Sequence, residues 1–356
     1  MRRAIAVVAA VLVFGPVVVG AAPEEAYTES LGKLELSDLL IEPVFRMDEP
    51  KLASFGLGNS YLAATWKRDS ALSAELKVGS RDLIGAPMRY GVAMDSELSL
   101  VEAYAQYDSV YGRIRAGLIP IAFSSQGGDT EARLSLTRSL LFANRQVNLR
   151  DYGFSYRLTN EGFFSDWAIH NGEGGKDLDN ELWFTARWGY EGGRFFRAGV
   201  SGSAGRTSPS STNPLGVSSS ADAGLDVDKI ARIRIANLFF DWEISPVRIE
   251  FQATGGDTRQ DDDISKFRTL NADFIIAANE RLSWILRYDT YDPKTDAGGD
   301  LVTEGTAGLA WRTRYDNSVL YLLGTKRWLQ DASSERHAFL VMWRVTPSAV
   351  GYRTAL

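Results

Sequence analysis

The feature that most constrains this chain is an alternation of apolar and polar residues that recurs in short segments along most of its length. From Val247 to Thr254, every odd-numbered residue is apolar and every even-numbered residue is polar. The segment from Arg281 to Asp289 alternates in the same way except at Ile285. The segment from His337 to Val345 has aromatic or β-branched residues at every odd-numbered position after His337. Successive side chains of a strand point to opposite faces, so this pattern predicts β-strands with one apolar and one polar face.

About sixteen such segments can be counted, each bounded by turn residues. They lie near 31–46, 55–68, 70–82, 97–108, 111–121, 150–158, 163–171, 180–190, 194–205, 229–243, 246–256, 265–278, 280–291, 302–315, 317–329 and 335–346. The links after even-numbered segments are tight, whereas several links after odd-numbered segments are long, as at 83–96, 122–149, 206–228 and 292–301. Short turns on one rim and long loops on the other are typical of outer-membrane barrels, whose turns face the periplasm.

A soluble β-sandwich is the main alternative, because it also contains alternating strands. In a sandwich the apolar face packs inward and the outward positions are mostly charged, whereas a membrane barrel turns its apolar face to lipid and collects aromatic residues near strand ends. Tryptophans fall within the predicted strands, among them Trp66, Trp183, Trp188, Trp242, Trp311, Trp328 and Trp343. We therefore predict an all-β fold, a transmembrane antiparallel β-barrel of about sixteen strands with short periplasmic turns and long extracellular loops.

The ends of the chain predict export. Arg2 and Arg3 precede an apolar run that closes on small residues, as in a signal peptide, so we expect residues 1–21 to be removed. Residues 22–346 then form the barrel domain and residues 347–356 a C-terminal tail. The chain has no cysteine, which is consistent with an oxidising compartment. The predicted location is the cell outer membrane.

Arginines are the candidate pore residues. The loop at 122–149 follows the fifth segment, and in a barrel of this kind such a loop folds inward and narrows the channel. Other arginines occupy strands, where a charge facing lipid would cost about 2–4 kcal/mol near the midplane. The predicted lining and constriction residues are Arg113, Arg115, Arg133, Arg138, Arg145, Arg187, Arg232, Arg234 and Arg287. For the arginines of the loop, a solvated surface position is the alternative.

Enzymatic chemistry finds little support in the sequence. The net charge of −6 argues against a nucleic-acid surface. His170 and His337 are the two histidines, and no hydrolase, metalloprotease or phosphate-loop motif accompanies them. We interpret His170 as a turn residue and the acidic residues at 257–263 as a hydrated loop. No catalytic residue, metal or cofactor is predicted.

Several short motifs, in order, resemble the phosphate-selective porin O and P family. They span about residues 97 to 346 and are Ala103-Tyr104-Ala105-Gln106-Tyr107, Arg115-Ala116-Gly117 before Pro120, Arg150-Asp151-Tyr152-Gly153, Asn171-Gly172-Glu173-Gly174 before Ala186-Arg187, and Arg287-Tyr288-Asp289 before Asp292-Pro293. The resemblance implies a sixteen-stranded trimeric barrel with an arginine-lined path and a constricting third loop. The loop has no lysine between residues 122 and 149, so phosphate specificity is not carried over.

The sequence therefore predicts an outer-membrane porin, a water-filled channel for passive diffusion of small hydrophilic solutes, with a preference for anions as a hypothesis. Its expected partners are outer-membrane lipid, small solutes or anions, and two further copies in a homotrimer. The alternative is a plugged or narrow barrel with a structural or surface-interaction role.

Overall fold

The computed structural model describes residues 32–48, 52–80, 98–128, 134, 136–144, 146–172, 181–192, 196–207, 229–296, 298–313, 317–330 and 335–346. The predicted signal peptide, the predicted C-terminal tail, Arg133 and Arg145 lie outside the described residues. Among the described residues, no helix is long and apolar enough to cross a membrane.

Eighteen strands and one short helix make up the described secondary structure. They are β1 (Lys33–Leu40), β2 (Val44–Asp48), β3 (Leu52–Gly56), β4 (Tyr61–Lys67), β5 (Leu72–Ser80), β6 (Leu98–Ser109), β7 (Gly112–Pro120), α3 (Leu140–Ala143), β8 (Arg150–Asn160), β9 (Phe163–His170), β10 (Trp183–Glu191), β11 (Phe196–Thr207), β12 (Ala231–Ile244), β13 (Val247–Gln260), β14 (Asp263–Ala277), β15 (Leu282–Asp292), β16 (Val302–Arg312), β17 (Ser318–Leu329) and β18 (Arg336–Val345).

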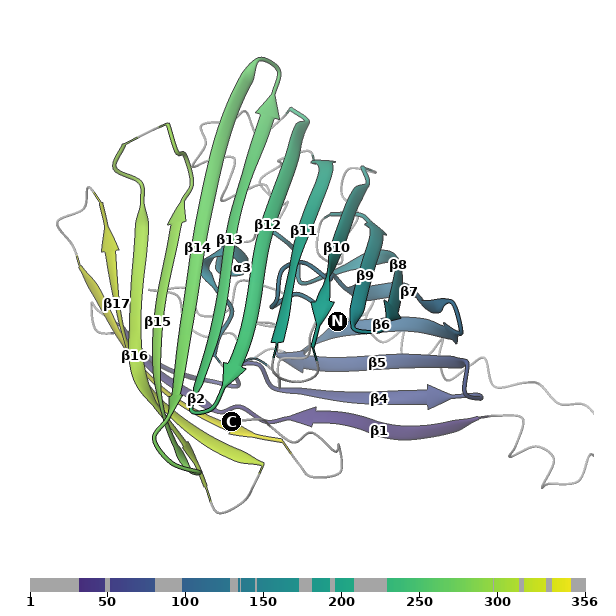
Figure 1. Cartoon of the computed structure of the whole chain (residues 1–356), viewed down its shortest axis with the longest axis horizontal. Coiled ribbons are helices and arrows are strands. Elements are labelled where there is room, and N and C mark those ends of the chain that lie inside the picture. Colours follow the sequence, from purple (N-terminus) through teal and green to yellow (C-terminus); the bar gives the residue numbers. More distant parts are fainter. Residues whose placement is uncertain are drawn as a thin grey trace, which may run out of the picture. The chain divides into compact units, whose positions relative to one another are not determined.

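Every strand pairs antiparallel with its chain neighbour from β4 to β18, and β18 then pairs with β2 (Figure 1). β2 pairs with β3, and β1 pairs with β4. β1 and β2 are two parts of one strand position, interrupted before Pro43, and β3 and β4 are two parts of the next. Eighteen strands with two positions divided in this way give sixteen positions, which confirms the prediction from alternation.

The two rims differ in the length of their links, also as predicted. On one rim, Glu161 and Gly162 join β8 to β9 with positive φ angles of 48° and 86°, the backbone that a two-residue hairpin turn requires. On the other rim, residues 121–149 join β7 to β8. The acidic residues at 257–263 differ from the prediction: β13 and β14 continue past the expected strand ends, so that only Asp261 and Asp262 form the turn.

Apolar side chains are exposed on one face of the sheet and charged side chains are buried on the other, the reverse of what a soluble protein shows. In β15, Trp284, Leu286 and Tyr288 are 52%, 48% and 47% exposed, whereas Arg287 and Asp289 are 8% and 2% exposed. Outward-facing aromatic rings also pair across strands, as in the β9 and β10 pair Trp167 and Trp188, whose centroids are 4.9 Å apart. The polar phase therefore faces the interior of the barrel, and the apolar phase faces outward.

Candidate functional site

The link between β7 and β8 runs through the interior of the barrel. We call its described residues between Ile121 and Leu149 the lumen loop. Its helix α3 has three buried residues, Leu140, Leu141 and Phe142. They pack in one cluster with Phe123 and Val147 of the loop and with inward residues of four strands: Trp183, Ile233, Ile235, Phe267 and Tyr291. Apolar burial thus holds the loop inside, against β10, β12, β14 and β15 (Figure 1).

Hydrogen bonds to the wall fix the position of α3. The backbone N–H of Leu140 donates to Asp289 Oδ2 of β15 at 2.7 Å. One residue earlier, Ser139 Oγ accepts from Gln252 Nε2 of β13 at 2.6 Å. These bonds satisfy polar groups that the apolar cluster would otherwise bury without partners.

Buried arginines of the wall donate to carbonyl oxygens of the lumen loop. Arg187 of β10, which is 0% exposed, donates from Nη1 to the carbonyls of Ser124 and Gly127, both at 2.9 Å. Arg287 of β15 donates to the Thr137 carbonyl at 2.6 Å, and Arg344 of β18 donates to the Leu134 carbonyl. The loop is therefore anchored to the wall on several sides.

Each of these three arginines also has a carboxylate partner in the wall. Arg187 pairs with Asp166 at 2.8 Å, Arg287 with Asp273 at 2.5 Å, and Arg344 with Glu42 at 2.6 Å. Pairing offsets the desolvation of charges that are this deeply buried. These arginines therefore act first as anchors of the loop, and much of their charge is balanced within the wall.

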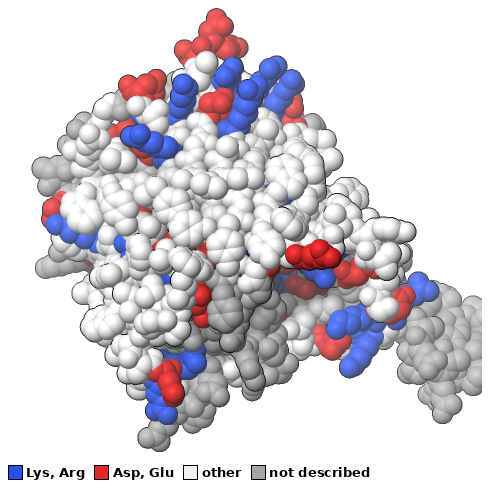
Figure 2. Space-filling model, in the orientation of Figure 1, with Lys and Arg blue, Asp and Glu red and all other residues white. Residues whose placement is uncertain are grey.

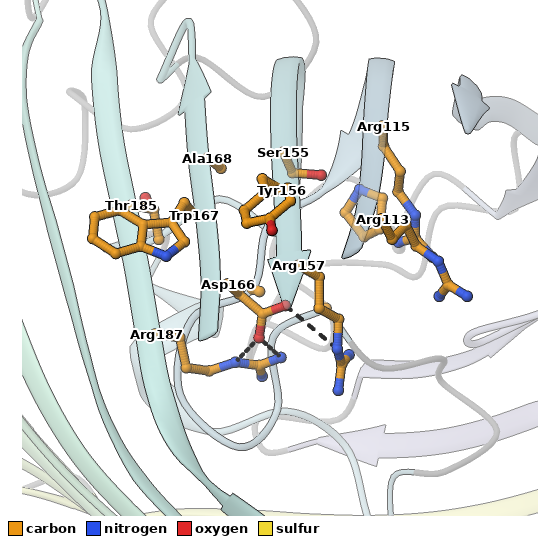
Figure 3. Close-up of a pocket in the computed structure, with 13 residues that line it drawn as sticks. Arg113, Arg115, Ser155, Tyr156, Arg157, Asp166, Trp167, Ala168, Thr185 and Arg187 are labelled. Atoms are coloured by element: carbon orange, nitrogen blue, oxygen red, sulfur yellow. Dashed lines mark hydrogen bonds and ion pairs between the residues drawn. The ribbon is translucent and has the colours of Figure 1, made fainter. Parts of the chain in front are cut away.

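A first cavity lies beside the beginning of the lumen loop. Its described lining contains four arginines and one carboxylate: Arg113, Arg115, Arg157, Arg187 and Asp166. Arg157 and Arg187 reach the same carboxylate of Asp166 from neighbouring strands (Figure 3). Arg113 and Arg115 are half-buried residues of β7, so their guanidinium groups stay accessible to the cavity. Positive charge exceeds negative charge in this lining.

Two contacts hold the β7 arginines in place. Arg113 Nε pairs with Asp108 Oδ1 at 2.7 Å, and Arg115 Nε donates to the neutral Gln106 Oε1 at 2.9 Å. The Arg115 guanidinium also lies over the ring of Tyr104, 4.8 Å from its centroid. Gln106 and Tyr104 are neutral, but Glu75 and Asp108 both interact electrostatically with Arg115. The charge of Arg115 is therefore balanced in part by the wall.

A second cavity lies beside the middle of the lumen loop, on the side of β15 to β18 and β2. Its described lining contains Arg46, Arg138, Arg287 and Arg327 together with Asp48, Asp289 and Glu304. Two of these residues, Arg327 and Glu304, form an ion pair. Four arginines and three carboxylates nearly balance, so this cavity is close to neutral.

The structure brings five of the predicted lining residues to the interior. Arg113, Arg115 and Arg187 line the first cavity, and Arg138 and Arg287 line the second. Arg138 is a buried loop residue that donates to the carbonyl of Gln126.

Arg232 and Arg234 lie elsewhere, which corrects their expected position. Both are exposed in the phase of β12 that also exposes Leu238 and Trp242. The physical reason is that the intervening isoleucines, Ile233 and Ile235, turn inward to pack against α3. Because the side chains of a strand alternate, the two arginines must then face outward.

Arg157 was not predicted as an interior residue, and His170 was predicted as a turn residue. Arg157 lies between the outward residues Tyr156 and Leu158. This alternation in the sequence predicts that Arg157 faces the interior. His170 is the last residue of β9 and is buried, so the interpretation as a turn residue is wrong. Its Nδ1 lies 2.8 Å from Asp151 Oδ2, and its Nε2 lies 2.9 Å from Thr185 Oγ1.

The His170 group carries no catalytic assignment. Thr185 is 1% exposed, and its Oγ1 is hydrogen-bonded to Ser203 Oγ at 2.8 Å. A hydroxyl enclosed in this way has no route to a substrate. Among the described residues, no group of three or more His, Asp or Glu side chains has the arrangement of a metal site.

The chain was compared with protein families, curated proteins and solved structures. No protein-family model and no curated protein matches the chain. Among solved structures, the anion-selective porin from Comamonas acidovorans is similar with a TM-score of 0.61 and 12% identity, over 89% of this chain and 100% of that chain.

Two other solved structures show comparable similarity. The outer membrane channel DcaP of Acinetobacter baumannii has a TM-score of 0.62 and 10% identity, over 93% of this chain and 100% of that chain. The trimer form of OmpT, an outer membrane protein of Vibrio cholerae, has a TM-score of 0.59 and 9% identity, over 89% and 99%. The chain has the fold of the outer-membrane β-barrel porins, while the narrower resemblance to porins O and P stays a prediction.

Proposed function

We propose that the chain is an outer-membrane porin, a water-filled channel through which small hydrophilic solutes diffuse with a preference for anions. The observation that carries this proposal is the lining of the first cavity, which contains four arginines, Arg113, Arg115, Arg157 and Arg187, and one carboxylate, Asp166. An excess of arginine at a constriction favours anions. Transport of this kind involves no chemical step and no cofactor.

The outer face supports the membrane location. Large apolar side chains are exposed on strand after strand, including Phe154, Leu238, Trp284 and Trp343. Acyl chains are the environment in which such a face is stable. We propose that the chain reaches the outer membrane after removal of residues 1–21 and assembles there as a homotrimer, as one of the similar proteins does by its description.

The test is ion selectivity in planar lipid bilayers. Purified protein should give stable conductance steps, and its reversal potential under a salt gradient should show anion preference. Arg113→Ala with Arg115→Ala should reduce that preference. The matched control, Arg232→Ala with Arg234→Ala, removes the same charge from the outer face and should leave it unchanged. Cation selectivity of the wild type would contradict the proposed anion preference.

The anchoring of the lumen loop favours a second function. The apolar cluster around α3 and the arginine contacts from β10, β15 and β18 are those of a packed interior. In this alternative the barrel is narrow or plugged, and its role is structural or depends on its surface. Electrical silence of correctly folded protein at all voltages would support this function over diffusion.

A further inference from the structure

A band of basic side chains lies on the outer face, near the rim of the long links. It consists of exposed residues of four neighbouring strands: Arg206 of β11, Arg232 and Arg234 of β12, Arg259 of β13, and Lys266 and Arg268 of β14. Figure 2 shows basic side chains gathered in this region, at the top of the view, with acidic side chains above and among them and a largely uncharged surface below. We call these six residues the outer basic band.

The register of the strands places like charges opposite one another. Arg206 pairs in register with Arg232, and Arg232 pairs with Arg259, so that three arginines form one row across three strands. Like charges directly opposite each other destabilise a sheet. No carboxylate lies in this row itself, so negative charge from outside the sheet would stabilise it.

Acidic neighbours balance only part of the outer basic band. Arg259 pairs with Asp257 and Arg268 pairs with Asp292, both at 3.0 Å. Within the part of the chain that the structure describes, no ion pair is formed by the other four members: Arg206, Arg232, Arg234 and Lys266. Asp257, the partner of Arg259, lies opposite both Arg234 and Lys266 in the register of the sheet. Arg206 and Arg232 therefore face outward with no carboxylate opposite them among the described residues.

The position of the band along the strands indicates the ligand. In β12 the exposed phase continues from Arg232 and Arg234 through Ala236 to Leu238 and Trp242, so basic residues directly follow apolar ones on the same face. Four residues of a strand span about 13 Å. A molecule with an apolar body against Leu238 would thus present its head group to the arginines.

We propose that the outer basic band binds the phosphate-bearing head groups of membrane lipids in the leaflet at the long-link rim. Arginine forms charge-assisted, often bidentate hydrogen bonds with phosphate, and the apolar residues below contact the acyl chains. This inference depends on the proposed membrane location of the barrel but not on its conduction or selectivity.

The test is binding of lipid A, a glycolipid with two phosphate groups, to the full purified protein in neutral detergent. Bound lipid is counted by native mass spectrometry, and affinity is obtained by titration. Because each basic residue near a surface contributes roughly fivefold in affinity for anionic lipid, Arg232→Ser with Arg234→Ser should weaken binding about 25-fold. Arg232→Lys with Arg234→Lys, which keeps the charge, should restore most of it.

Two controls separate this inference from the function of the pore. Arg113→Ser with Arg115→Ser removes equal charge from the interior and should leave lipid binding unchanged. On wild-type protein, lipid A without its phosphates should bind weakly, a test that requires no variant to fold. Conductance of the outer-band variant in neutral bilayers should equal that of wild type, so failure of the channel and failure of lipid binding are distinguishable.

Three results would overturn the inference. The first is undiminished lipid A binding by the Arg232→Ser, Arg234→Ser variant. The second is equal binding of the dephosphorylated lipid. The third is complete displacement of lipid A by millimolar inorganic phosphate, which would indicate a site for the free ion in place of a lipid head group.

Discussion

The two cavities beside the lumen loop contain the same number of arginines but differ in their acidic residues. The first has one carboxylate in its described lining, Asp166, and the second has three: Asp48, Asp289 and Glu304. The lining of the first cavity therefore has a positive excess, which Asp108 beside Arg113 reduces, whereas the lining of the second is nearly neutral. The difference teaches that a count of arginines does not determine selectivity, because neighbouring carboxylates decide how much charge reaches a solute.

The largest expected effect tests the anchoring of the first cavity. Arg187→Ala leaves Asp166 buried with only the more distant Arg157, 3.7 Å away, and removes two bonds to the loop. We expect a loss of about 3–5 kcal/mol in the free energy of unfolding, measured by urea titration in micelles. Arg327→Ala in the second cavity removes a partly exposed pair and should cost about 1 kcal/mol or less. Equal losses would contradict the inference that the Arg187 pair is the more deeply buried of the two.

The next effect concerns ion selectivity. Arg113→Ala with Arg115→Ala removes two of the four positive charges of the first cavity. Since a charge in contact with a permeating ion in water contributes about 1 kcal/mol, each substitution should lower the ratio of anion to cation permeability by about fivefold. Reversal potentials measure this ratio. An unchanged ratio would mean that solutes do not pass the first cavity.

A smaller and opposite change is expected from the second cavity. Glu304→Gln removes one of its three carboxylates and leaves the charge of Arg327 unbalanced. Anion preference should therefore rise, by less than about fivefold because Glu304 is partly exposed and screened. The isosteric amide keeps the side-chain volume. A shift towards cations would show that the charge balance of this cavity has another origin.

The smallest effect is expected on the outer face. Arg234→Ala removes an exposed charge from β12 without touching either cavity. Unfolding free energy in neutral detergent should change by less than about 0.5 kcal/mol, and conductance in neutral bilayers should not change. A change in ion selectivity would indicate that Arg234 lies near the permeation path and would contradict its position on the outer face.

The sequence alone predicts whether some strand side chains face inward or outward. In β12 the residues Leu238, Phe240 and Trp242 share one parity with Arg232 and Arg234, which predicts that all five face the same way. The same argument, applied to the alternation around Arg157, places that residue inside. The phase of a strand is a local property, so it can be determined from a few neighbouring residues.

The path of the lumen loop could not be predicted in the same way. The polar partners of α3 are Asp289 and Gln252, which lie far along the chain from Leu140 and Ser139. Only the pairing of all the strands brings them to one interior. The same holds for Arg344, whose partner Glu42 stands near the other end of the barrel sequence.

The sequence by itself determined the strands, their two faces and the two kinds of rim, because a period of two and turn residues act over neighbouring positions. The tertiary structure decided which arginines anchor the loop, which line the positive cavity and which face outward. The reason is that the effective charge of an arginine depends on the carboxylate beside it, and for Arg187, Arg287 and Arg344 that carboxylate comes from another part of the chain.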